Sequence, residues 1–277
     1  MLRGLLWIAL TVCCIGGLAF AQESEADSTY EIAWEYGPTL SKMGDLAEIT
    51  VPEGYLFAGA EDTKLLMTLM GNPVSETEQG FFSPDSMEWF AVFEFDEVGY
   101  IKDDEKESLD PEGMLESIRE AQIEGNKRRR EMGYSGLEIL GWANEPHYDA
   151  ATNNLEWAIR MQDDEGNHII NHNTRILGRR GVMRVTLVVN PESLDEVLPL
   201  YKNYLDGFAY QSGEKYAEFR EGDKIAEYGL SALVLGGAAA VAAKSGLLKH
   251  LWKLIAVGIA AIGGFFKKFF GKKEADA

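Results

Sequence analysis

The sequence predicts an α+β domain, an antiparallel sheet with packed helices, followed by C-terminal membrane-associated helices. Three observations predict it. Residues 155–189 hold three strand-like runs separated by short turns, which is typical of an antiparallel meander. Two capped helical patterns, at 110–133 and from residue 193, flank these strands. The last fifty residues contain two nearly uncharged apolar runs.

Residues 1–21 have the features of a secretory signal peptide. Arg3 precedes an apolar run from Leu5 to Leu18, and residues 19–21 form the small-x-small pattern that signal peptidase recognises. The mature chain is therefore expected to start at Gln22. A lipoprotein signal is the less favoured alternative, since the residue before the first cysteine is not small.

Composition excludes several functions. Both cysteines, Cys13 and Cys14, leave with the signal, so the mature chain is expected to lack disulfides, thiol nucleophiles and cysteine zinc ligands. Residues 22–224 contain 18 basic and 42 acidic residues, a net charge of −24. Such a domain repels phosphate, so nucleic acid is not expected as a partner.

The first half of the chain alternates between strand and helix patterns. Residues 22–37 form a polar lead, and 38–224 form the acidic extracytoplasmic domain. Residues 46–59 read as a strand, a Pro-Glu-Gly turn and a second strand. The run 61–70 is a short helix with acidic residues at its start, and 88–101 alternates aromatic and acidic residues as a half-buried strand does.

The longest helix of the domain is predicted at 110–133. Asp110 can cap it, Pro111 suits its first turn, and Gly133 ends it. The basic run 127–130 is interpreted as a solvated helix end that complements the helix dipole.

Antiparallel strands follow this helix. Residues 137–162 contain two strands joined by a turn-rich bridge, and the chain then runs back through 168–177 and 182–189. In the second strand Trp157 shares one face with Leu155, Ile159 and Met161. A helix from Ser193, its predicted cap, closes the domain.

Two histidines, His168 and His172, lie four residues apart within the meander. On a strand they share a face about 13 Å apart, at about 3.3 Å per residue, too far to hold one metal ion. They are interpreted as part of a polar, exposed sheet face, and Arg179-Arg180 as a tight turn. No metal site and no cofactor are expected.

The sequence resembles a bacterial family of membrane-anchored proteins of unknown function. The resemblance rests on "VPEGYLF", "WFAVFEFDEVGYIKDD", "GWANEPHYDAATNNLEWA", "NTRILGRRGV" and "AEYGLSALVLGGAAAVAAKSGLL", and extends from about Trp34 to about Lys273. It implies export, a periplasmic domain and a C-terminal anchor, and it carries no activity or catalytic residues. The element order also resembles small α+β sandwiches of the photosystem-accessory and nuclear-import-factor type.

No motif for catalysis is present, and no catalytic residue is assigned. The best candidate cluster combines a histidine, carboxylates and aromatic side chains within one short run. The candidate binding residues are Trp142, Glu145, His147, Tyr148, Asp149, Arg179 and Arg180. A histidine near carboxylates can transfer protons. The structural alternative is that the carboxylates shape the hairpin and the tryptophans belong to the core.

A membrane anchor region is predicted at 225–270, with a short polar tail at 271–277. Residues 229–248 carry one charge over twenty positions and are the best transmembrane candidate; 251–270 is interpreted as a second, membrane-associated helix. Small residues recur every fourth position in both runs and could pack against another helix. They are Ala232, Gly236, Ala240, Ala256, Ala260 and Gly264.

The sequence therefore predicts a protein of the bacterial inner membrane whose acidic domain faces the periplasm. Basic residues after the apolar run place the C-terminus in the cytoplasm. The expected partners are the lipid bilayer and either other envelope proteins or further copies of the chain. The favoured function is a non-enzymatic interaction or envelope-maintenance module. The alternatives are an envelope hydrolase using His147, Glu145 and Asp149, and a metal or small-ligand carrier.

Overall fold

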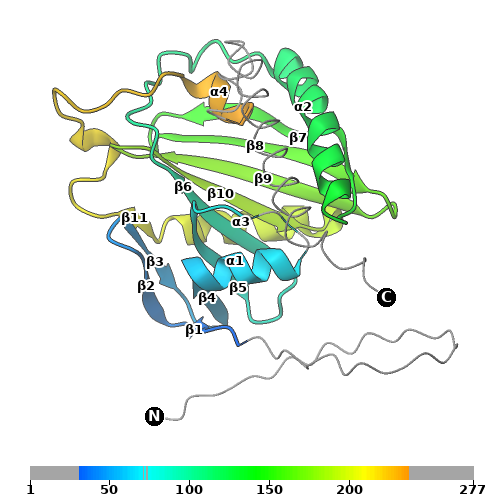
Figure 1. The fold of residues 1–277 in the computed structure, drawn as a ribbon. Coiled ribbons are helices and arrows are strands. Elements are labelled where there is room, and N and C mark those ends of the chain that lie inside the picture. Colours follow the sequence, from blue (N-terminus) through cyan, green and yellow to red (C-terminus); the bar gives the residue numbers. More distant parts are fainter. Residues whose placement is uncertain (1–30, 71, 73, 237–277) are drawn as a thin grey trace, which may run out of the picture.

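The computed structural model describes residues 31–236, except 71 and 73, as two antiparallel sheets with packed helices (Figure 1). The predicted α+β class is confirmed. The predicted signal peptide and residues 237–277 lie outside the described residues.

The larger sheet has eight antiparallel strands. In spatial order they are β1 (Glu35–Tyr36), β4 (Tyr55–Gly59), β5 (Glu78–Pro84), β6 (Phe90–Asp96), β10 (Val182–Val189), β9 (His168–Leu177), β8 (Asn154–Asp163) and β7 (Leu137–Asp149). A second sheet has three, in the order β11 (Phe208–Tyr210), β3 (Ala47–Val51) and β2 (Thr39–Met43).

One long-range strand pair joins the two halves of the large sheet. Strand β10 pairs with β6 along its length, from Val182 opposite Asp96 to Val188 opposite Phe90. The predicted meander is confirmed, because β8 pairs with β9 and β9 with β10.

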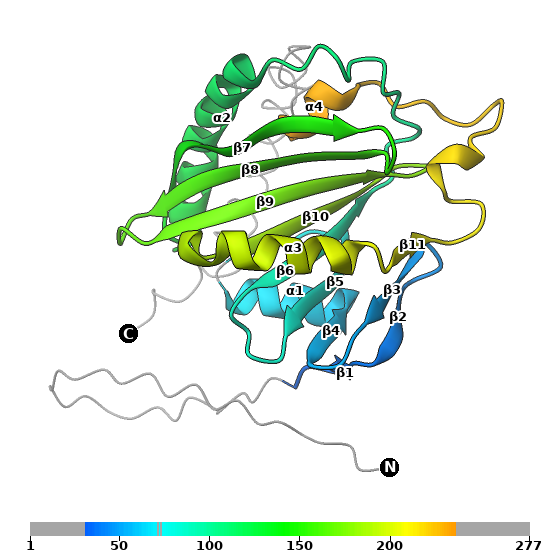
Figure 2. The ribbon, with the colours of Figure 1, turned by 180° about the vertical axis from the view of Figure 1, so that it is seen from behind.

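The side of the large sheet covered by helix α3 (Leu194–Leu205) and the smaller sheet is called the α3 face here (Figure 2). Alternate side chains of β10 point into this core, and Met183, Val185 and Leu187 are fully buried. A short 3₁₀ turn at Pro191–Ser193 precedes helix α3, and another at Tyr216–Glu218 follows strand β11. The Ser193 side chain makes no capping bond, so that predicted detail is wrong.

The opposite side, called the α2 face, carries helices α1 (Ala60–Leu69), α2 (Pro111–Glu131) and α4 (Leu230–Val234) (Figure 1). Helix α1 packs on β4 and β5 at one end of the sheet, and α2 packs on β7 at the other. Between them lie β6, β10, β9 and β8.

Helix α2 begins and ends where the sequence predicts. The Asp110 side chain accepts a hydrogen bond from the Gly113 backbone N–H at 3.2 Å, and Pro111 occupies the first turn. Gly133, just after the helix, has φ +82°, a left-handed conformation that glycine adopts without steric cost.

The domain is larger than the predicted 38–224. At its start, Glu35 and Tyr36 pair with β4, so the polar lead at 22–37 does not extend to residue 37. At its end, helix α4 belongs to a core cluster, with Leu230 fully buried and Leu233 nearly so.

The burial of α4 corrects the predicted transmembrane segment at 229–248. Its first turn packs against protein, α4 ends at Val234, and Gly236 turns the chain with φ +99°. Ala232 and Gly236 therefore do not continue one helix, and the stripe that they were predicted to share is interrupted. Ala240, Ala256, Ala260 and Gly264 lie outside the described residues. Across 31–236 no helix is both long and apolar enough to cross a membrane.

Candidate functional site

The predicted cluster in 142–149 is divided between the two faces of the sheet. The Trp142 indole N–H donates to the Pro111 carbonyl at 3.0 Å on the α2 face, and Tyr148 packs in the same core. His147 instead lies opposite Glu156, toward the α3 face. Irregular pairing between Asn144 and His147 shifts the register, which the alternation of residues alone does not reveal.

The two candidate carboxylates of this run are exposed. Asp149 accepts a hydrogen bond from the Ala151 backbone N–H at 2.8 Å, and this bond lowers the pKa of the Asp149 carboxyl. Asp149 therefore shapes the turn after β7, as the structural alternative predicts. Glu145 is exposed beside the buried Pro146.

Residues from three elements meet around one carboxylate on the α3 face. The Lys202 ammonium of α3 lies 2.8 Å from Glu156 Oε2, and the Nε2 atoms of His147 and His172 lie 3.9 and 3.8 Å from that oxygen. We call these four residues the Glu156 cluster. The Glu156 side chain is only 10% exposed, so the lysine neutralises a nearly buried charge.

His172 is buried, which contradicts the predicted exposed face. Its residue exposure is 1%, and its ring lies 5.6 Å from that of Tyr201 in an edge-on arrangement. Burial lowers the pKa of His172 to about 4, against the attraction of Glu156, so the ring is neutral at pH 7. His168, on the same face, is exposed and lies within hydrogen-bond distance of Gln162. The two histidines differ in exposure because helix α3 covers one end of strand β9 and not the other.

The Glu156 cluster reaches solvent only at its edge. The His147 side chain is 58% exposed there, whereas the His172 side chain is enclosed. No set of three metal-ligating side chains suited to holding an ion occurs in the part of the chain that the structure describes.

Sequence reasoning missed Glu156 and Lys202. Glu156 alternates with the apolar residues of β8, a pattern that normally places a carboxylate in solvent. The only signal in the sequence was a charged residue between two apolar ones, Leu155 and Trp157. The position of α3 over this face was needed to recognise the cluster.

A second group of polar side chains occupies the centre of the α2 face. Arg184 pairs with Glu94 at 2.8 Å and with Asp96 at 3.1 Å. Arg175 lies with its guanidinium carbon 4.5 Å from the centre of the Trp157 ring, and burial lowers its pKa to about 9. We call Asn171, Asn173, Arg175, Arg184, Thr186 and Glu94 the polar strip.

Arg179 and Arg180 hold the C-terminal part of the domain in place. Arg179 donates from Nε and from Nη2 to the two oxygens of the Asp223 carboxylate, each at 2.7 Å, and these bonds lower the pKa of Asp223 to about 2. Arg180 contacts Glu214 at 2.8 Å and Glu97 at 2.6 Å. The predicted tight turn is therefore present, but its arginines are engaged within the chain.

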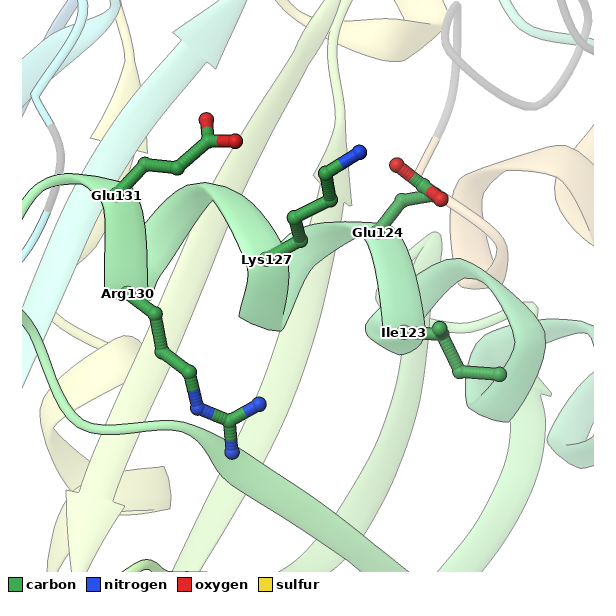
Figure 3. A pocket seen from close by; sticks show the side chains of 5 residues that line it. All are labelled: Ile123, Glu124, Lys127, Arg130 and Glu131. Atoms are coloured by element: carbon green, nitrogen blue, oxygen red, sulfur yellow. The ribbon is translucent and has the colours of Figure 1, made fainter.

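Two shallow cavities border these elements. One, of about 540 Å³, follows the outer side of α2 and is lined by Ile123, Glu124, Lys127, Arg130 and Glu131 (Figure 3). The other, of about 320 Å³, lies at the turn between β9 and β10 and includes Arg179 and Arg180. Neither includes Glu145, His147 or Asp149, the three residues that the hydrolase alternative requires in one cleft.

Comparison with solved structures gives distant similarities. The solution structure of the cyanobacterial PsbP, CyanoP, from Synechocystis sp. PCC 6803 is 10% identical with a TM-score of 0.40, covering 68% of this chain and 99% of that one. The Saccharomyces cerevisiae Ran-binding protein Mog1p is 12% identical with a TM-score of 0.36, covering 67% of this chain and all of that one.

A family assignment is more specific. No curated protein matches the sequence. A family model described as "Protein of unknown function (DUF2167)" matches residues 35–266, which contain every described strand and helix. The expected resemblance to a family of unknown function is confirmed. The chain belongs to the DUF2167 family.

Proposed function

We propose that this chain is an acidic interaction domain, tethered by the residues after Gly236 to the outer side of a bacterial inner membrane. Its partners are other envelope proteins or further copies of itself. This proposal retains the predicted location and partners, and moves the start of the membrane-contacting segment from Gly229 to beyond α4.

The charged candidate residues contact other side chains of the same domain, and this observation carries the proposal. Lys202 and His147 surround Glu156, and Arg179 and Arg180 bind acidic residues of the segment 213–224. These side chains join elements that are distant in the sequence. These contacts stabilise one conformation of the domain. This favours a role in binding other proteins over a role in catalysis.

The composition of the chain supports the tether. After Gly236 there are seven lysines and two acidic residues, whereas the domain itself carries a large negative charge. With α4 buried, the remaining apolar runs are 237–248 and 254–266, each too short for a crossing that takes about 20 residues. Together with their lysines they suit contact with the interface or a shallow insertion.

The tether is tested by location and by washing. Reporter fusions made after Gly236 are expected to behave as exported, and the full chain is expected to stay with membranes in high salt and at alkaline pH but to dissolve in detergent. Release by salt alone would show that the residues after Gly236 only adsorb to the surface.

The interaction role is tested by photo-cross-linking in living cells. A photoreactive residue at an exposed position, such as Glu145 or Leu200, is expected to capture specific envelope proteins or a second copy of the chain. A chain that yields no adduct from any exposed face, while remaining folded and exported, would contradict the proposal.

A further inference from the structure

The outer strands of the two sheets differ in how their free edges are protected. An outer strand presents backbone N–H and C=O groups to which another strand can bind. At the edge strand β7, the Asn126 side chain of helix α2 bonds both the N–H and the carbonyl of Leu137. Arg119, also of α2, donates to the carbonyl of Leu140 at 2.9 Å. Pro146 and three shifts of register make the rest of this edge irregular.

Strand β2, at the edge of the smaller sheet, has no such protection. Its five residues pair with β3 without a shift of register. Figures 1 and 2 both show β2 on the outside of the smaller sheet. The other outer strands, β1 and β11, have only two and three residues. In the part of the chain that the structure describes, β2 is therefore the longest regular edge.

The backbone groups that point outward from β2 belong to Leu40 and Lys42. Thr50, opposite Leu40 on β3, donates its N–H to the Gly207 carbonyl at 3.0 Å, on the side of β11. Opposed residues of an antiparallel pair direct their backbone groups either toward each other or both away. Leu40 therefore directs its groups away from β3, and so does Lys42 two residues later. No described residue bonds to these outward groups.

The surroundings of this edge are strongly acidic. Residues 31–63 contain seven acidic residues and one basic residue. The Glu35 carboxylate lies against the middle of β2, where it accepts a hydrogen bond from Ser41 Oγ at 2.6 Å. Asp45 and Glu53 are exposed in the turns at the two ends of the β2–β3 pair. Charge complementarity therefore favours a basic partner over an acidic one.

The side chains of β2 restrict which strand can pair with it. Leu40, 53% exposed, and Lys42 lie on the outer side, while Ser41 between them faces inward. A strand added at this edge places one residue opposite each of them, on the same side. An apolar residue suits the position opposite Leu40, and a basic residue suits the position opposite Ser41. Lys42 repels a base directly opposite itself, which disfavours other registers.

We propose that β2 binds an extended, basic segment of another envelope protein as an additional strand. The segment pairs through its backbone with Leu40 and Lys42, and its basic side chain opposite Ser41 forms an ion pair with Glu35. This site rests on the proposed interaction role, for which it gives the surface and the chemistry of the partner.

Peptide binding to the mature full-length chain in detergent tests the charge preference. The probe is a fluorescent peptide, Thr-Val-Thr-Val-Lys-Val-Thr-Val-Thr, and its control has glutamate in place of lysine. At about 0.15 M salt the lysine peptide is expected to bind at least about threefold more tightly in fluorescence anisotropy. Glu35→Gln should remove most of this preference, whereas Glu120→Gln, at an exposed position on α2, should not. Equal binding of the two peptides, or the same effect of both substitutions, would overturn the proposal.

Proline substitution tests the backbone pairing. Proline lacks an N–H, and at an outward-pointing position it leaves the bonds to β3 in place. Leu40→Pro is expected to weaken binding of the lysine peptide at least about fivefold, while Leu40→Val, which keeps the N–H, changes it less than about twofold. In the parent chain, which needs no substitution to fold, the bound peptide should slow hydrogen exchange at the amides of residues 40 and 42. Unchanged exchange at both amides would contradict pairing at β2.

Photo-cross-linking in cells separates this site from the interaction role as a whole. If both hold, a photoreactive residue at position 40 captures a partner, and Glu35→Gln weakens that adduct. Adducts from Glu145 or Leu200 with none from position 40 would overturn the β2 site and leave the interaction role standing. Peptide binding at β2 without adducts from any exposed position would support the site and contradict the role.

Discussion

The environment of His172 makes the stability of the fold depend on pH. Its ring is buried, and its pKa of about 4 lies below the value of about 6.5 expected in the unfolded chain. The folded state therefore prefers the neutral ring. This contribution to stability is complete above pH 6.5 and is lost as the pH falls from 6.5 toward 4.

Acidification is accordingly expected to destabilise the domain through His172. Between pH 7 and pH 5 the loss in unfolding free energy is about 2 kcal/mol from this group alone. Urea denaturation at both pH values measures it. His172→Gln should reduce the pH dependence by that amount, whereas His168→Gln, at an exposed position, should leave it unchanged. The same pH dependence in both variants would show that another group is responsible.

Trp157 is the second residue with a predicted large effect. It is 2% exposed and supports the buried Arg175 on its ring face. Trp157→Ala leaves a cavity and removes this support, so a loss of about 3–5 kcal/mol is expected in chemical denaturation. Leu200→Ala, a truncation at a half-exposed position, should cost within about 0.5 kcal/mol. A similar cost for both would place Trp157 outside the core.

At the scale of an element, substitutions at two glycines are expected to change the stability of the domain in opposite directions. One glycine lies within helix α2 and the other just after it. Gly125 lies within the helix, and an added Cβ would meet only the Gln122 side chain at 3.9 Å. Gly133 follows the helix with φ +82° and has open space around it. Steric room is available at both positions, so backbone conformation alone separates them.

Gly125→Ala is therefore expected to stabilise the domain by about 0.5–1 kcal/mol, and Gly133→Ala to destabilise it by about 1–2 kcal/mol. Thermal unfolding of the two variants beside the parent measures both. If both substitutions changed the unfolding temperature equally and in the same direction, the conclusion that the helix ends before Gly133 would be contradicted.

At the scale of the whole molecule, Arg179 and Asp223 hold residues 213–224 against the turn between β9 and β10. The guanidinium binds the carboxylate with two bonds, a geometry that lysine cannot reproduce. Arg179→Lys and Arg179→Ala should both speed proteolytic cleavage within 213–224. Arg160→Ala, at an exposed strand position, serves as the control and should not. Unchanged cleavage in the Arg179 variants would show that other contacts hold this segment.

Much of the fold follows from local pattern. The strands of the meander are recognisable because apolar and polar residues alternate and turns separate them. Helix α2 is recognisable because Asp110, Pro111 and Gly133 satisfy the backbone at its ends. These features act over a few residues, so the sequence by itself determined them. The family assignment also depends on sequence alone.

Only the tertiary structure decided which polar residues are buried and what the start of the apolar C-terminal run touches. Glu156 and His172 occupy ordinary strand positions, and their burial depends on α3, which lies far along the chain. Leu230 and Leu233 fit a membrane segment or a protein core equally well, because both environments exclude water from the same apolar surface. The physical reason is that burial depends on contacts between distant elements, while local pattern records only which side chains favour it.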